Sequence, residues 1–261
     1  MKKRDPTVDE ITEVVKACAH DDVVLIGGIA VSLLASVYKV QTIEPIYTSD
    51  GDFFGDHLAL TKSKAALPWN SREYVATMDE STPNVGKLAV DVAEDAKPVE
   101  VDFLSSVNNL SSDEIEQRAI KLQIGDKIVR VLHPILVLES KIGNLALYPN
   151  KRNQGGVGQA KAAVAIAKAY LSGIQTERER EQLNGMERVG RFAAREGACY
   201  VHKIFGVDAL GALPDQPISR AFIDRRLPQI REQVTGRRQA FDSLWDRTAQ
   251  FRDPKKERYR P

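Results

Sequence analysis

The stretch Tyr47-Thr-Ser-Asp-Gly-Asp-Phe-Phe-Gly-Asp56 (YTSDGDFFGD) places two carboxylates one residue apart, at Asp50 and Asp52, directly before an aromatic pair. Side chains alternate between the two faces of a strand, so on a strand both carboxylates point to one side and Gly51 points to the other. Two carboxylates this close repel each other unless a cation bridges them or one of them takes a proton. The stretch therefore predicts a strand within residues 44–55 that carries a pair of metal ligands.

A third carboxylate stands in an apolar setting later in the chain. The segment VEVDFLSS (99–106) alternates as a strand does and carries Asp102, with Glu100 on the same face. Mg²⁺ prefers oxygen ligands and usually binds through one or two carboxylates plus the phosphates of a substrate. We therefore expect Mg²⁺ or Mn²⁺ at Asp50, Asp52 and Asp102. Asp102 or Glu100 could extend the site to a second ion, as in enzymes of phosphoryl or nucleotidyl transfer.

The acidic stretch has two other interpretations. DGDFFGD begins like an EF-hand calcium loop, but the fifth and twelfth positions of such a loop fall on Phe54 and Thr61, which are unsuitable there. Asp-x-Asp also occurs in loops that have no chemistry, and the stretch alone does not decide against that interpretation.

The segment VVLIGGIAVSLLASV (23–37) precedes the acidic stretch. Residues 22–28 form a β-branched apolar run that ends in Gly27-Gly28, which is typical of a buried strand that turns sharply, and residues 29–38 have a helical pattern. Exposed N–H groups at a helix N-terminus bind phosphate, and glycine lets a phosphate approach the backbone closely. Gly27 and Gly28, with Ser32 one turn later, are candidate phosphate ligands; a tight turn without a ligand is the alternative.

The rest of the chain predicts an α+β protein in two parts. Residues 1–132 are expected to form a mixed sheet flanked by helices, and residues 133–261 an α-helical C-terminal domain. The expected elements are a helix over 7–20 with a Thr7–Glu10 capping box, strands over 72–78, 87–93 and 99–106, a hairpin over 120–132 centred on Gly125-Asp126, helices over 135–148 and 158–173, a mobile loop over 148–159, and only helices from about residue 176.

Charge and composition narrow the class of protein. Residues 171–261 hold 18 Lys and Arg against 13 Asp and Glu, whereas residues 1–170 hold 19 against 23. The Arg-rich part suits an anionic partner such as RNA or an acidic protein, although amphipathic helices with a solvated charged face give the same composition. Cys18 and Cys199 form no metal or disulfide pattern, no signal-peptide pattern is found, and Val23–Val37 is shorter than the ~20 residues of a membrane span. We expect a cytoplasmic protein.

Three motifs in this order resemble the nucleotidyltransferase superfamily, which has the polymerase-β-like fold. They are hGG at a strand end (LIGGIAVS), T-x-D-x-D on a strand (TSDGD) and h-D-h on a later strand (VEVDFL). The helical second half and the segment HPILVLESKIGNLALYPNKR resemble most the AbiEii-type nucleotidyltransferases, the toxin halves of bacterial toxin–antitoxin pairs. The resemblance covers about residues 20–175.

The resemblance implies an Mg²⁺-dependent enzyme that moves NMP from an NTP to a hydroxyl of RNA, such as a tRNA 3′ end, or of a protein, with an antitoxin as partner. It also implies roles for single residues. Asp50, Asp52 and Asp102 would bind the metal and carry catalysis. The nucleotide phosphates would be held by Gly27, Gly28, Ser32 and Lys141, with Arg152 as a weaker match; for Lys141 and Arg152 the alternative is a solvated helix face and loop.

Two differences from the family pattern keep other functions open. The gap from Gly28 to Asp50 is longer than in the family, which places an insertion within 38–46, and GQAKAAVAIA offers Lys161 but no aspartate where the family has a Lys-Asp pair. One alternative is an antibiotic-modifying nucleotidyltransferase, which would need an acidic pocket for a cationic drug. The other is a non-catalytic module that binds a nucleotide or a partner.

Overall fold

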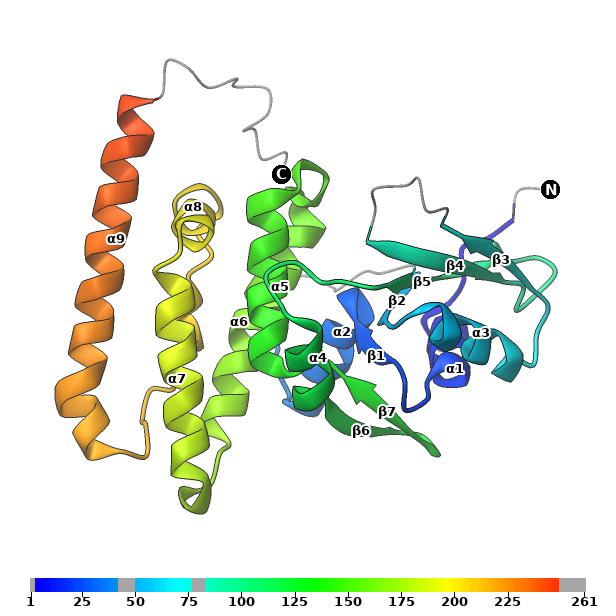
Figure 1. Ribbon diagram of the computed structural model, residues 1–261, viewed down its shortest axis with the longest axis horizontal. Helices are drawn as coiled ribbons and strands as arrows, with labels where there is room; N and C mark the ends of the chain where they lie inside the picture. The colour runs from blue at the N-terminus through cyan, green and yellow to red at the C-terminus, as the bar shows by residue number, and fades with distance from the viewer. Residues whose placement is uncertain (1–2, 42–49, 77–82, 249–261) are drawn as a thin grey trace. The chain divides into compact units, whose positions relative to one another are not determined.

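The protein has an α+β fold with a mixed sheet, flanking helices and a helical C-terminal region (Figure 1). The computed structural model describes residues 3–41, 50–76 and 83–248. The chain forms two compact units, one of Met1–Leu33 and Ile46–Leu136 and the other of Leu34–Pro45 and Val137–Pro261. Among the described residues, no helix combines the length and the apolar character that crossing a bilayer requires.

The first unit is built on a seven-stranded sheet in the order β3-β4-β5-β2-β1-β7-β6. β2 runs parallel to β5 and β1 parallel to β7, while the other neighbours are antiparallel. The strands confirm the positions expected within the described residues, including the hairpin around Gly125. Their bounds are β1 Val24–Ile26, β2 Asp50–Phe54, β3 Ser71–Val75, β4 Asn84–Val90, β5 Val99–Leu104, β6 Ile120–Ile124 and β7 Lys127–Val131.

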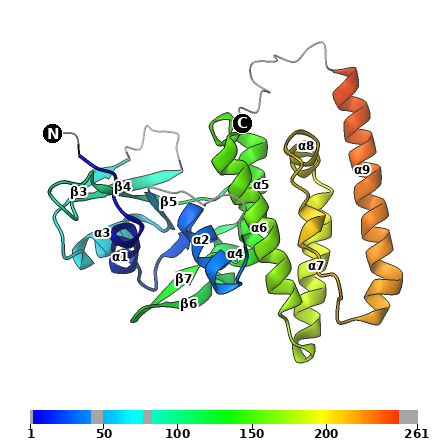
Figure 2. The same ribbon diagram turned by 180° about the vertical axis from the view of Figure 1, so that it is seen from behind.

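One face of the sheet is the core of this unit. Helices α1 (Val8–Cys18) and α3 (His57–Ala66) lie side by side in both views (Figures 1 and 2), with α1 against β2 and β5 and α3 against β4. Gly51 faces α1, because a Cβ built on it would lie 3.1 Å from Val15. On the same face Phe53 stacks on Phe103, with ring centroids 5.7 Å apart. The alternate residues Asp50 and Asp52 therefore point to the opposite face.

The second unit is helical. Its helices are α6 (Gln154–Ser172), α7 (Glu179–Ala193), α8 (Glu196–Phe205), α9 (Leu227–Arg247) and α5 (Pro134–Leu147) from Val137 onward, with short turns η1 (Pro149–Lys151), η2 (Thr176–Arg178), η3 (Ala209–Ala212) and the π-helical η4 (Phe222–Arg226). Helices α7 and α9 approach closely where Gly190 meets Ile230, since a Cβ on Gly190 would lie 2.6 Å from that side chain. Inside this unit Arg188 makes a bidentate ion pair with Glu139, whose side chain is 1% exposed.

The capping box of α1 is confirmed: Thr7 accepts from the Glu10 N–H, and Glu10 accepts from the Thr7 N–H. Two expectations are wrong. Residues 148–159 are not a loop, because η1 begins at Pro149 and α6 begins at Gln154, where the Asn153 side chain caps the Gly156 N–H. The pair Gly27-Gly28 belongs to helix α2 (Gly27–Val37) rather than to the strand.

Two helices were not expected at all. They are α3 and α4 (Ser112–Arg118), and each begins at a side-chain cap, Asp56 and Ser111 respectively, that falls in a polar stretch of sequence. The first part of the strand expected over 44–55, the expected insertion within 38–46 and the last residues of the strand expected over 72–78 lie wholly or partly outside the described residues.

Candidate metal centre

Three aspartates converge on the face of the sheet opposite α1. Because β2 and β5 are parallel and in register, Asp52 lies directly opposite Asp102, and Asp50 lies opposite Glu100. One carboxylate oxygen from each of Asp50, Asp52 and Asp102 lies within 4.8 Å of the others. The convergence expected from the sequence is confirmed. A cluster of three carboxylates at this separation could bind a metal ion and is compatible with Mg²⁺.

The electrostatics of Asp102 also fit a bound cation. Burial raises the pKa of the Asp102 carboxyl, Lys87 lowers it, and Asp50 and Glu100 add to the rise. Its Oδ1 atom is buried and accepts no hydrogen bond, and Lys87 Nζ at 3.4 Å makes an ion pair with it that lacks the alignment of a hydrogen bond. A buried oxygen without a hydrogen bond costs free energy, and a metal ion beside it would offset that cost.

Lys87 is the member of this site that the sequence did not reveal. It lies on β4 directly opposite Asp102, and its Nζ donates to Glu100 Oε2 at 2.8 Å. Glu100, a sequence candidate for a second metal, is therefore engaged by an ammonium group and is not part of the three-carboxylate cluster. In the sequence, Lys87 is only the first residue of the strand expected over 87–93. Its neighbour on the adjacent strand depends on the strand register, which cannot be read from the sequence.

Position 27 needs a glycine for structural reasons that do not involve a phosphate. Gly27 has φ of +71°, and a Cβ built on it would lie 1.8 Å from Oδ2 of Asp52. Glycine is needed both for the left-handed backbone and for the space that the Asp52 carboxylate fills. Gly28 is buried in the first turn of α2, where its carbonyl accepts from Ser32 Oγ at 3.3 Å. The phosphate roles of Gly27, Gly28 and Ser32 stay predictions.

Lys141 lies in the second unit, on α5. Its side chain is buried, and its Nζ donates to Gln159 Oε1 at 2.7 Å. It does not stand on a solvated helix face, so the alternative considered for Lys141 is wrong.

Arg152 is in the same unit and closes the C-terminal end of α5. Its Nε donates to the carbonyl of Leu145 at 3.0 Å and its terminal nitrogen to the carbonyl of Ala146 at 2.7 Å. The guanidinium also lies 5.0 Å from the centre of the Tyr200 ring. Cations near a helix C-terminus satisfy its last carbonyls and its dipole, so Arg152 has a stabilising function whether or not it meets a phosphate.

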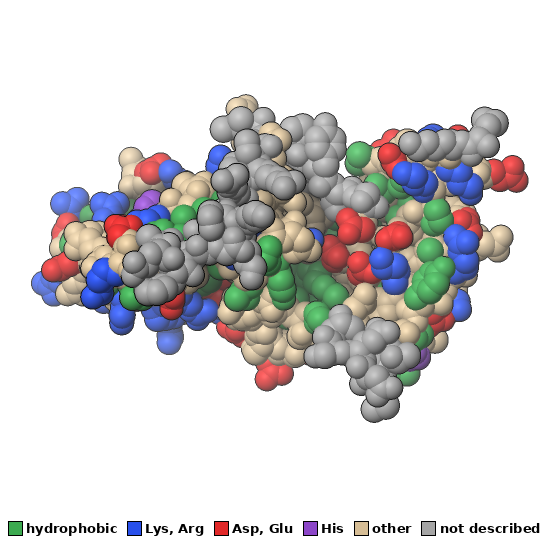
Figure 3. Space-filling view, turned by 90° about the horizontal axis from the view of Figure 1, so that it is seen from above, with side chains coloured by type: hydrophobic (Ala, Val, Ile, Leu, Met, Phe, Trp, Pro, Cys, Tyr) green, Lys and Arg blue, Asp and Glu red, His purple; other side chains and the backbone are tan. Residues whose placement is uncertain are grey.

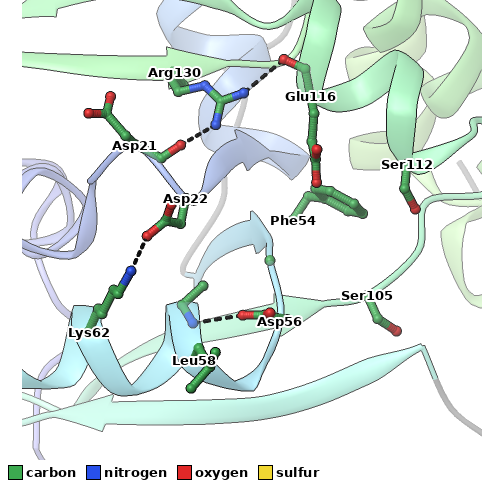
Figure 4. Close-up of a pocket in the computed structure, with 12 residues that line it drawn as sticks. Asp21, Asp22, Phe54, Asp56, Leu58, Lys62, Ser105, Ser112, Glu116 and Arg130 are labelled. Atoms are coloured by element: carbon green, nitrogen blue, oxygen red, sulfur yellow. Dashed lines mark hydrogen bonds and ion pairs between the residues drawn. The ribbon is translucent and has the colours of Figure 1, made fainter.

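An acid-lined cavity of about 500 Å³ lies elsewhere in the first unit (Figure 4). Its walls include four acidic residues, Asp21, Asp22, Asp56 and Glu116, and two basic ones, Lys62 and Arg130. Lys62 pairs with Asp22, and Arg130 donates to the backbone carbonyls of Asp21 and Glu116.

The cavity lies towards the C-terminal ends of β2 and β5. It is lined by Phe54 and by Gly55 and Ser105, the residues that follow β2 and β5. Phe54 is four residues beyond Asp50, which is about 13 Å of strand. The cavity is therefore at the far end of β2 from Asp50.

Comparison with known proteins identifies no family. No family model matches the chain, and no curated protein matches it. A solved structure, that of JHP933 from Helicobacter pylori, is similar over 93% of both chains at 14% identity, with a TM-score of 0.38.

Proposed function

We propose that the protein is an Mg²⁺-dependent nucleotidyltransferase that moves NMP from an NTP to a hydroxyl acceptor with release of pyrophosphate. One observation carries the proposal: Asp50, Asp52 and Asp102 converge within 4.8 Å on one sheet face. Their order in the chain, after a glycine turn and on two strands, is the order that resembles the superfamily. Three carboxylates so placed are suited to the reaction, since phosphoryl-type transfer needs mainly positioning and neutralisation of charge.

The proposal gives separate roles to the three aspartates and to Gly27. Asp50 and Asp52 on β2 and Asp102 on β5 would hold the ion. When bound, the ion neutralises phosphate charge and lowers the pKa of an attacking hydroxyl. Gly27 leaves room for the Asp52 carboxylate and so fixes the place of that ligand. Asp102 would complete the metal site and help to activate the acceptor hydroxyl, as the resemblance implies.

The acceptor proposed is RNA, such as a tRNA 3′ end, with a protein hydroxyl as the second choice, and the protein would act as a toxin held in check by an antitoxin. Support comes from exposed arginines of η4 and α9. Arg225, Arg231 and Arg237 are exposed, and no carboxylate of the described residues lies within 4.0 Å of their guanidinium groups. Unpaired surface cations favour a polyanion.

The experiment is a labelling assay with two matched variants. Purified protein receives each α-³²P-NTP with Mg²⁺ and total RNA, and the labelled species are separated on a gel. We expect labelled RNA with the natural protein and none with Asp52→Asn. Asp126→Asn, at a hairpin residue whose side chain is 89% exposed, serves as the control and keeps activity. Transfer by Asp52→Asn at the rate of the natural protein would overturn the proposal.

The same assay separates the alternatives. Label that appears only on an added aminoglycoside would indicate an antibiotic-modifying enzyme. The acid-lined cavity would suit such a cation, whereas the exposed arginines of η4 and α9 favour an RNA acceptor. Binding of NTP without any need for Mg²⁺, together with no turnover, would indicate a non-catalytic module, which the missing Lys-Asp pair would then explain.

A further inference from the structure

The ammonium group of Lys87 lies between two carboxylates of β5. Its Nζ is 2.8 Å from Glu100 Oε2 and 3.4 Å from Asp102 Oδ1. These acids are one residue apart and share a strand face, and Lys87 projects from the neighbouring strand opposite Asp102. The Lys87 ammonium group therefore occupies the position that a metal ion bridging Glu100 and Asp102 would take.

Charge explains why a cation is needed there. The sheet face carries Asp50, Asp52 and Asp102 together with Glu100, and these four carboxylates repel one another strongly. One divalent ion at the three aspartates leaves Glu100 without compensation. Lys87, which is charged at neutral pH, supplies that compensation through the Glu100 contact and also faces Asp102.

We propose that Lys87 is the built-in second cation of this centre. The nucleotide-free protein then takes one divalent ion at Asp50, Asp52 and Asp102, and the Lys87 ammonium closes the Glu100 side to a second ion. Two-metal enzymes obtain both positive centres from bound ions; here one of them belongs to the polypeptide. The inference rests on the metal centre of the proposed function but concerns how many ions it holds.

The test is a titration with Mn²⁺ in the absence of nucleotide, in which electron paramagnetic resonance reports free Mn²⁺. The natural protein is expected to bind one ion. In Lys87→Met the first ion should bind about tenfold more tightly, because a unit charge a few ångströms from a divalent ion repels it by more than 1 kcal/mol even at the dielectric constant of water. A second ion should also bind, next to Glu100. Lys87→Arg should stay at one ion.

A double-mutant cycle separates this role from ordinary electrostatics. Glu100→Gln should weaken the first ion in the natural background, because Lys87 then turns wholly to Asp102. In the Lys87→Met background the same change should abolish the second ion while altering the first far less. Lys121→Met, which removes an exposed lysine of β6 in the same unit, controls for the loss of a charge as such. Lys87→Gln replaces Lys87→Met if circular dichroism shows that the latter does not fold.

The outcomes distinguish this inference from the proposed function. Two ions in the natural protein, or no change of affinity and stoichiometry in Lys87→Met, would overturn the role of Lys87 and leave nucleotidyl transfer untouched. A pattern as expected, in a protein that transfers no label to any acceptor, would keep the role of Lys87 and reject the enzyme. No Mn²⁺ binding by the natural protein would reject both.

Discussion

Gly27→Ala should both destabilise the protein and disable its metal centre, because two costs coincide at this residue. The backbone φ of +71° is left-handed, which costs an L-residue other than glycine about 1–2 kcal/mol. The new Cβ would also lie 1.8 Å from Asp52 Oδ2, 2.6 Å from Cγ and 2.7 Å from Cβ of the same side chain. An overlap this deep with a whole carboxylate forces Asp52 or the turn to move, which typically costs about 1–3 kcal/mol. The expected total is about 2–5 kcal/mol.

Gly125→Ala is the matched control. Gly125 lies in the same unit and also has a left-handed φ, of +61°, but a Cβ there would meet only the flexible end of Lys16, at 3.2 Å. Its cost should therefore be the backbone cost alone, about 1–2 kcal/mol. Urea unfolding monitored by circular dichroism measures both free energies, and the Mn²⁺ titration measures the metal centre. We expect Gly27→Ala to lose metal binding and Gly125→Ala to keep it.

A second pair of variants isolates the contact with Asp52. If the clash is the larger cost, replacing Asp52 by glycine should recover most of the stability lost in Gly27→Ala and leave only the backbone cost. Equal destabilisation by Gly27→Ala and Gly125→Ala, with metal binding intact in both, would refute the reasoning. It would show that Asp52 can leave its place beside the turn without consequence.

Three further predictions concern charge. Arg188→Met should lower the free energy of unfolding in urea by about 3–5 kcal/mol, because it leaves Glu139 buried and unpaired, and Glu139→Gln in the same chain should restore part of it. Burial raises the folded-state pKa of Asp102, so ionisation of this carboxyl destabilises the metal-free protein as the pH rises through that pKa. At pH 7, Asp102→Asn should therefore unfold at a higher urea concentration than the natural protein. The difference between the two proteins should shrink towards pH 4. Mg²⁺ at 100 times its Kd should stabilise the natural protein by about 2.7 kcal/mol and so raise its melting temperature. Chelation of the ion should reverse the rise, and Asp52→Asn should show no rise. A rise of equal size in Asp52→Asn would contradict the site.

The sequence predicted that Asp50 and Asp52 share a strand face because that arrangement depends on a local rule. The period of two along a strand places Asp50 and Asp52 on one face whatever their neighbours are. The pairing of Asp52 with Asp102 could be expected only from motif order, since the register of two strands fifty residues apart depends on packing. The roles of Lys87 and Gly27 could not be predicted from the sequence for the same reason, because each depends on a contact across the sheet or across a turn.

The core of the first unit and its cluster of three aspartates depend on a single register. On β2 and β5 the residues Gly51, Phe53 and Phe103 point to the α1 side and form the core, and the aspartates alternate with them on the other side. A slip of either strand by one residue would bury carboxylates under α1 and expose the phenylalanines, so burial of the aromatic rings enforces the convergence of the acids. The stability of the apolar face thus stabilises an arrangement of like charges that would otherwise separate, and Lys87, with the proposed divalent ion, would compensate those charges.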